Sequence, residues 1–176
     1  YGSGNSEHYD ISLTVYGFSL VMFGPAVTTG VIIVGHLVTY AMRRQNWAWY
    51  VHLFNVSSFV ILAGLASLIQ TGAHQLPGPE SATLVLGIAA GIVLFTAGNH
   101  AHVAGVLKLS EGVTLRQSGL FTLTSLLIDA TMLGAGALCA IVAAINPYAI
   151  VLGAAPLYLN YSVLRLPRLE RQAKTD

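Results

Sequence analysis

Residues 31–62 read VIIVGHLVTYAMRRQNWAWYVHLFNVSSFVIL, in which two apolar runs flank the cationic pair Arg43-Arg44. Trp49 and Tyr50 stand close to this pair, and both residue types concentrate where a membrane meets water. The apolar sequence on either side is long enough for helices that cross the hydrocarbon, which takes roughly 20 residues. This stretch therefore predicts two membrane-spanning helices joined by a short cationic turn.

The composition of the whole chain also favours a membrane protein. Of its 176 residues, 55% are hydrophobic and only 9% are charged, whereas a soluble domain carries about 25% charged residues. The net charge of +1 and the lack of a basic helix exclude a nucleic-acid partner. We therefore expect membrane lipids to be the main surroundings of this protein.

Five apolar runs predict an all-α bundle of five transmembrane helices over residues 11–166, with polar tails at 1–10 and 167–176. The predicted spans cover residues 11–42, 49–71, 82–107, a fourth from just after Arg116 to 144, and 147–164. The Gly24-Pro25 pair is expected to kink the first span. It is not expected to divide that span, because each half would be too short to cross.

The cationic residues predict the orientation of this bundle. Five spans place all eight Lys and Arg residues on one side of the membrane, in three clusters: Arg43 and Arg44; Lys108 and Arg116; Arg165, Arg168, Arg171 and Lys174. Cytoplasmic loops are enriched in Lys and Arg. The pattern therefore predicts an external N-terminus and a cytoplasmic C-terminus, and we expect a bacterial inner (plasma) membrane.

Histidines are the most unusual polar residues of the predicted spans, which contain or adjoin His36, His52, His100 and His102. A rise of ~1.5 Å per residue places three of them, all except the shallower His52, about 10 Å below the cytoplasmic charges. Ionisable residues in hydrocarbon usually face a cavity, a partner or a cofactor. Neutral imidazole is also a common ligand of metals and of haem iron.

Two histidines at one depth on different helices can hold a b-type haem. The sequence predicts His36 and either His100 or His102 as axial ligands, with His52 nearby, and His36 with His102 as the preferred metal-binding pair. His100 and His102 point about 200° apart on a helix, so only one of them can face the iron. The pattern does not distinguish haem from chlorophyll or copper, and each histidine is also compatible with ordinary helix packing.

Asp129 is the only acidic residue within a predicted span, about 20 Å beyond Arg116 if the helix starts there. No Lys or Arg is predicted at that depth. The carboxyl group is therefore expected to be protonated or hydrogen-bonded, with Thr131, Asn99 or the backbone as partner. Asp129 and Asn99 are candidates for a proton or substrate path, and a neutral carboxylic acid that ties helices together is the alternative.

Three functions are compatible with these residues. The first is a haem b-binding electron-transfer subunit that exchanges electrons between a quinone and a partner protein, as the membrane subunit of an oxidoreductase. The second is a small-solute or proton-coupled transporter that uses Asp129 and Asn99. The third is a structural subunit of a larger membrane complex. All three favour a homo-oligomer or an assembly with partner membrane subunits.

Overall fold

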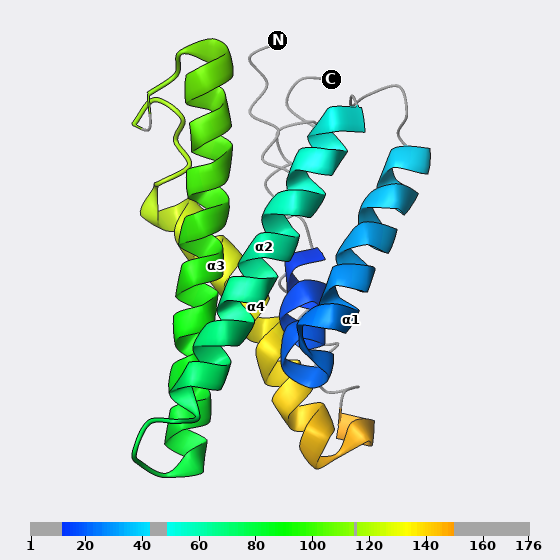
Figure 1. Cartoon of the computed structure of the whole chain (residues 1–176), viewed down its shortest axis with the longest axis vertical. Helices are drawn as coiled ribbons and strands as arrows, with labels where there is room; N and C mark the ends of the chain where they lie inside the picture. Colours follow the sequence, from blue (N-terminus) through cyan, green and yellow to red (C-terminus); the bar gives the residue numbers. More distant parts are fainter. Residues whose placement is uncertain (1–11, 43–48, 115, 150–176) are drawn as a thin grey trace, which may run out of the picture.

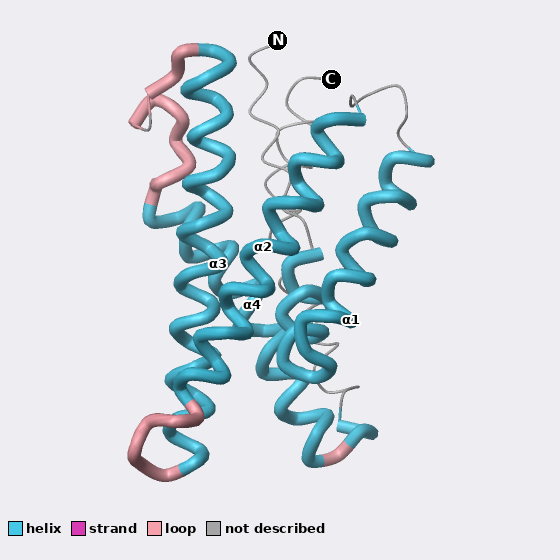
Figure 2. The backbone as a smooth tube through the Cα atoms, viewed as in Figure 1, coloured by secondary structure: helices cyan, strands magenta, loops and turns pink. Residues whose placement is uncertain are grey.

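The computed structural model describes residues 12–42, 49–114 and 116–149, which form an all-helical bundle (Figures 1 and 2). Its four helices are α1 (Ser12–Met42), α2 (Trp49–Ala73), α3 (Glu80–Glu111) and α4 (Leu123–Ile145), and a 3₁₀ turn follows at Pro147–Ala149. All four helices are long and apolar enough to cross a membrane. The predicted fifth span, both predicted tails and the cationic clusters at 43–44 and 165–174 lie outside the described residues, apart from Pro147–Ala149.

Helix α1 reverses its direction at Gly24. This residue has φ 78° and ψ −176°, a conformation that favours glycine, and Pro25 then begins the second arm without needing a backbone N–H donor. Tyr16 and His36 both contact the ring of Phe59, at centroid distances of 5.4 and 5.7 Å. In a straight helix these two residues would be about 30 Å apart. Figure 1 shows the dark-blue first arm running down and the lighter second arm returning upward.

The reversal at Gly24 is much sharper than the kink that the sequence predicts. An uncharged run of this length fits either one long tilted helix or two arms of a hairpin, and composition does not distinguish them. The first arm, residues 12–23, is about 18 Å long, which is shorter than the hydrocarbon thickness of about 30 Å. In place of the single continuous first span that the sequence predicts, residues 12–42 therefore form two arms that meet at Gly24.

The first arm of α1 packs tightly against α4 through two glycines. A Cβ atom at Gly136 would lie 2.0 Å from the carbonyl oxygen of Thr14 and 2.8 Å from the nitrogen of Phe18. A Cβ atom at Gly17 would lie 2.3 Å from the carbonyl oxygen of Leu133. Small residues at a helix contact let two backbones approach this closely. Glycine at these two positions is what allows the short arm to dock.

Helix α2 lies between the second arm of α1 and helix α3 (Figure 1). Its Phe59 ring stacks on His36 on one side and on Phe95 on the other, with the Phe59 and Phe95 centroids 5.9 Å apart. Phe95 and Ile32 are almost completely buried. Phe95 belongs to the buried apolar core and the half-buried Phe59 packs against it, so Phe59 lies between the histidine of α1 and helix α3.

The connection from α3 to α4 differs most from the prediction. The chain leaves α3 at Gly112 and folds back along that helix (the pink segment at the top left of Figure 2) before α4 begins at Leu123. The fourth helix therefore starts seven residues beyond Arg116, where the sequence analysis had begun it. The side chain of Thr122 caps the new start by accepting a hydrogen bond from the backbone N–H of Ser125, as N-cap residues do.

We expect cysteines placed at Gly78 and Ser110 to react with an impermeant thiol reagent from opposite sides of the membrane. Gly78 precedes α3 and Ser110 lies in the last turn of this helix, which has 32 residues and is about 48 Å long. The measurement is labelling of right-side-out and inside-out vesicles in a Cys139→Ser background. Labelling of both positions from the same side would contradict a transmembrane α3.

Replacing Gly136 by alanine should destabilise the protein by about 1–3 kcal/mol, because the new methyl group forces two backbones apart. Gly134→Ala, on the same helix, is the matched control, since its Cβ would meet only the Cδ1 atom of Ile92, at 3.8 Å. Thermal unfolding in detergent compares the two variants. Equal melting temperatures would refute the close contact between the first arm and α4.

Candidate functional site

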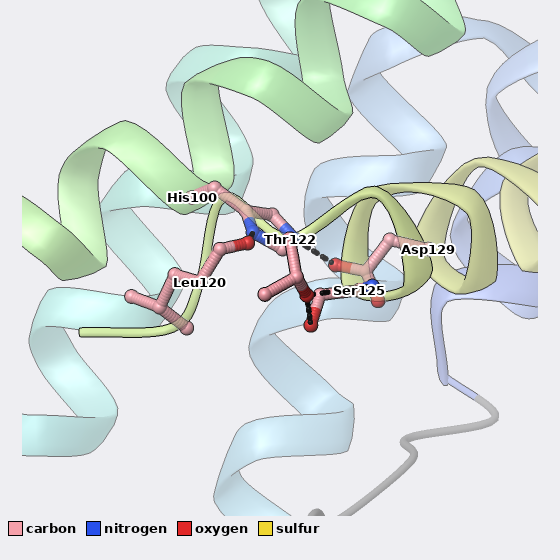
Figure 3. A network of polar contacts seen from close by, with 5 residues as sticks. All are labelled: His100, Leu120, Thr122, Ser125 and Asp129. Carbon is pink, nitrogen blue, oxygen red and sulfur yellow. Dashed lines mark hydrogen bonds and ion pairs between the residues drawn. The ribbon is translucent and has the colours of Figure 1, made fainter. Parts of the chain in front are cut away.

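The imidazole of His100, on α3, is hydrogen-bonded at both of its nitrogen atoms (Figure 3). Nε2 lies 2.9 Å from Oδ2 of Asp129 on α4, and Nδ1 contacts the backbone carbonyl oxygen of Leu120 in the preceding loop. The His100 side chain is only 5% exposed and that of Asp129 is 24% exposed. A buried histidine and a partly buried carboxyl group thus form a direct pair in a bundle that is otherwise mostly apolar.

These partners determine where the protons lie. The carbonyl of Leu120 can only accept a hydrogen bond, so Nδ1 of His100 carries a proton. On the other side, either a protonated Asp129 donates to Nε2, or Nε2–H donates to the Asp129 carboxylate. Both forms have no net charge, and they differ only in which residue holds one proton. The pair is therefore chemically suited to store and pass on a proton.

The loop before α4 brings the two residues together. Gly119 has φ 68°, a left-handed conformation that lets the chain turn towards α3, and the ring of Phe121 lies 6.0 Å from that of His100. Asp129 is only six residues into α4, or about 9 Å from its start. The sequence-based depth of about 20 Å was wrong, because residues 116–122 are not part of the helix.

The partner of Asp129 is therefore His100, which the residue pattern did not predict. It named Thr131, Asn99 and the backbone instead, but Thr131 is exposed. Among the described residues, no hydrogen bond joins Asp129 to the half-buried Asn99. Gly119 followed by Thr122 was the available signal, since a breaker and an N-cap residue together mark a helix start. Using that start would have placed Asp129 close to the level of His100.

His102 faces a different helix from His100, as their spacing predicts. Nδ1 of His102 lies 2.5 Å from the hydroxyl oxygen of Ser58 on α2, whereas His100 contacts α4. Hydrogen bonds of this kind commonly tie membrane helices together. The prediction that these two histidines cannot face one ligand is confirmed.

The remaining two candidate histidines meet each other at the contact between α1 and α2. The rings of His36 and His52 have centroids 5.9 Å apart, and Tyr40 lies 5.4 Å from His52. His52 is buried and His36 is half-buried.

The structure thus divides the predicted site residues into separate groups. It does not bring His36 together with His100 or His102, because α2 lies between them. Within the described ranges, no group of three or more His, Cys, Asp or Glu side chains is arranged to hold a metal ion.

An open cavity adjoins the His100–Asp129 pair at the end of the bundle that carries Arg116. It has a volume of about 460 Å³ and is lined by Arg116, Gly119, Phe121 and Thr122. The ring of Phe121, which lines this cavity, also contacts the imidazole of His100. On the other side of the pair, towards the start of α3, lies a narrow gap of about 10 Å³ lined in part by Gly17, Gln70 and Gly91.

The chain matches no known protein family, no characterised protein and no solved structure.

Replacing Asp129 by leucine should reduce stability by about 1–3 kcal/mol, because Nε2 of the buried His100 loses its hydrogen-bond partner. Asp129→Asn should cost much less, since its amide group can donate to the same nitrogen. Unfolding of both variants in detergent provides the comparison. If leucine is tolerated as well as asparagine, the hydrogen bond between α3 and α4 does not contribute to the fold.

Proposed function

We propose that this protein is a proton-coupled transporter of a small solute, in which His100 and Asp129 together hold the transported proton. The proposal rests on one observation: a buried imidazole is bonded to a carboxyl group on one side and to a backbone carbonyl on the other. Ionisable residues placed inside a membrane bundle typically mark ion paths and proton relays.

The charge of the pair explains why it suits coupling. With one shared proton the pair is neutral, and its burial then costs little compared with that of an isolated ion. A second proton makes the pair cationic, and loss of the shared proton leaves a carboxylate beside a neutral imidazole. Either change creates a net charge in a poorly solvated place. A solute or a conformational change that compensates this net charge lowers its energetic cost. Solute binding or the conformational change therefore becomes coupled to the protonation of the pair.

Openings on both sides of the pair support a path across the bundle. The cavity at Arg116 lies on one side of the pair, and Phe121, which lines it, contacts His100. The narrow gap lined by Gly17 and Gly91 continues towards the other end, and its small volume corresponds to a closed state with room for about one water molecule. The broken helix α1 contributes Gly17 to this gap, and discontinuous helices are frequent at the substrate sites of transporters.

The cationic residues at the cavity suggest its orientation. Lys108 and Arg116 belong to the end of the described bundle where α3 ends, and positive residues favour the cytoplasmic side. We therefore propose that the open cavity faces the cytoplasm, in a bacterial inner membrane. Lipids and further copies of the chain are the proposed neighbours.

Electron transfer through haem b is less well supported by this arrangement. That function needs His36 and either His100 or His102 to face one slot, but α2 and the ring of Phe59 stand between them. Both nitrogens of His100 are already bonded. A Soret band in the purified protein that shifts on reduction would favour the haem alternative over the transporter.

Proteoliposomes that contain a pH-sensitive dye provide the functional test. A panel of sugars, amino acids and organic acids is added outside under an imposed pH gradient. We expect at least one solute to accelerate proton movement by the wild-type protein. In Asp129→Asn the rate should fall to that of protein-free vesicles, because an amide cannot exchange a proton at these pH values.

His74→Ala is the matched control for this experiment, because His74 is an exposed histidine in the turn between α2 and α3. It should retain the wild-type rate. Full proton-linked transport by a correctly folded Asp129→Asn variant would contradict the proposal. So would a wild-type protein that moves no proton with any solute of the panel.

A further inference from the structure

Thr96, on helix α3, carries a buried hydroxyl group that the proposed transport does not yet use. The residue is only 4% exposed, and among the described residues no group forms a hydrogen bond with its Oγ1 atom. Nearly all buried polar groups in proteins have a partner, which either the chain or an ordered water molecule supplies. The partner of this hydroxyl is therefore to be sought outside the chain.

The hydroxyl of Thr96 differs from several others on these helices. Serine and threonine hydroxyls within a helix commonly donate a hydrogen bond to the carbonyl oxygen four residues earlier. Among the described residues, this bond is formed by Ser19, Thr28, Thr39, Thr71 and Ser110. Thr96 forms no such bond with the carbonyl of Ile92, so its hydroxyl can bond to a molecule that enters the bundle.

Spacing along α3 places Thr96 between the His100–Asp129 pair and the narrow gap. Ile92, Thr96 and His100 follow one another at intervals of four residues, so they share one face of the helix. The two outer members of this row face α4. Cδ1 of Ile92 lies 3.8 Å from the position of a Cβ atom at Gly134, and Nε2 of His100 lies 2.9 Å from Oδ2 of Asp129. Ile92 also lines the gap, so Thr96 is one turn from a gap-lining residue and one turn from the pair.

We propose that Thr96 binds a water molecule that connects the His100–Asp129 pair with the narrow gap. Side chains one helical turn apart have Cβ atoms about 5–6 Å from each other, and two hydrogen bonds of about 2.8 Å each span such a separation. A buried water molecule needs roughly two to four polar partners. The Thr96 hydroxyl is one partner, and Oδ1 of Asp129 is the other, because His100 contacts only Oδ2.

The narrow gap offers the next polar group beyond Thr96. Gln70 is a half-buried residue of α2 that lines the gap, and its Nε2 atom lies 3.4 Å from the position of a Cβ atom at Gly91. The other described residues that line the gap are glycines or have apolar side chains. The amide of Gln70 can therefore orient the one water molecule for which this gap has room.

Proton transfer along this chain leaves every residue as it was. The pair releases a proton to the water molecule at Thr96, and this water passes one of its own protons to the Thr96 oxygen. Thr96 then releases its original hydroxyl proton to the water at Gln70. One O–H bond forms for each bond to hydrogen that breaks, and nothing is oxidised or reduced. The relay role rests on the proton-coupled transport proposed above, whereas the water site itself does not.

Solid-state NMR of the full-length protein in lipid bilayers tests the water site directly. Magnetisation transferred from water should reach the side chain of Thr96, whose signal is assigned by its loss in Thr96→Val. Thr28 is the matched control, because it is equally buried but its hydroxyl is bonded to the backbone of Gly24. Water transfer at Thr96 that does not exceed the transfer at Thr28 would overturn the proposal.

Proton movement in proteoliposomes tests the relay. Thr96→Val should slow solute-driven proton movement by about tenfold or more, because the chain of hydrogen bonds is interrupted. Thr96→Ser keeps a hydroxyl and should retain most of the wild-type rate. Thr71→Val should retain it fully, since the hydroxyl of Thr71 already donates to the carbonyl of Ser67. An unchanged rate in Thr96→Val would contradict the relay.

The melting temperature separates a relay from a structural role. Thr96→Val should unfold close to the wild-type temperature, because no described protein group loses a hydrogen bond. A fall as large as that of Asp129→Leu would show that the hydroxyl ties helices together, and the proposal would then be wrong. Should Thr96→Val fail to fold, Thr96→Ala replaces it. If the wild type moves no proton with any solute, the transport function fails, and the NMR comparison alone decides the water site.

Discussion

A polar group inside a membrane has no water to bond with, and the arrangement around His100 follows from this constraint. Its imidazole needs a partner at each nitrogen, and the two partners come from different parts of the chain: a backbone carbonyl in the loop and a carboxyl group on α4. The loop therefore has to approach α3, and α4 has to begin six residues before Asp129 so that this carboxyl group meets His100. The proton storage that we propose for this pair depends on the same two contacts.

The broken helix α1 satisfies the same constraint in a different way. A reversal at Gly24 interrupts the backbone hydrogen bonds of a helix, and the hydroxyl of Thr28 donates a bond of 2.8 Å to the carbonyl of Gly24. The shorter arm then gains its stability by packing on α4 through glycine contacts at Gly17 and Gly136. Gly17 also lines the narrow gap beyond the His100–Asp129 pair, so the irregular helix contributes to the path that we propose.

Residue patterns predicted the helices of this protein better than the way they connect. Long apolar runs located α2 and α3 closely, because a helix in hydrocarbon requires such a run. The same criterion could not reveal the reversal at Gly24, since both arms are equally apolar. It also extended the fourth helix over residues 117–122, where Leu120 and Phe121 are as apolar as helix residues. Because of this one boundary error, the predicted depth of Asp129 did not match that of His100, its hydrogen-bond partner.

The arrangement of the histidines was also predicted only in part. Helical periodicity correctly separated the directions of His100 and His102, because that angle depends only on local geometry. Depth alone could not tell which helices are neighbours, and α2 lies where the haem hypothesis required open space between α1 and α3. The order of helices around a bundle depends on packing contacts such as the Phe59 stack, which single-residue patterns do not encode.

The protonation state of His100 tests the account most directly. Nitrogen NMR of histidine-labelled protein, with His100→Gln used to assign the signal, reports which ring nitrogen carries a proton. We predict a protonated Nδ1 at His100 whichever residue of the pair holds the shared proton, and a signal from Nε2 that shifts when Asp129 is replaced by asparagine. A neutral His100 protonated only at Nε2, with a spectrum indifferent to Asp129→Asn, would contradict the pair and the proton path built on it.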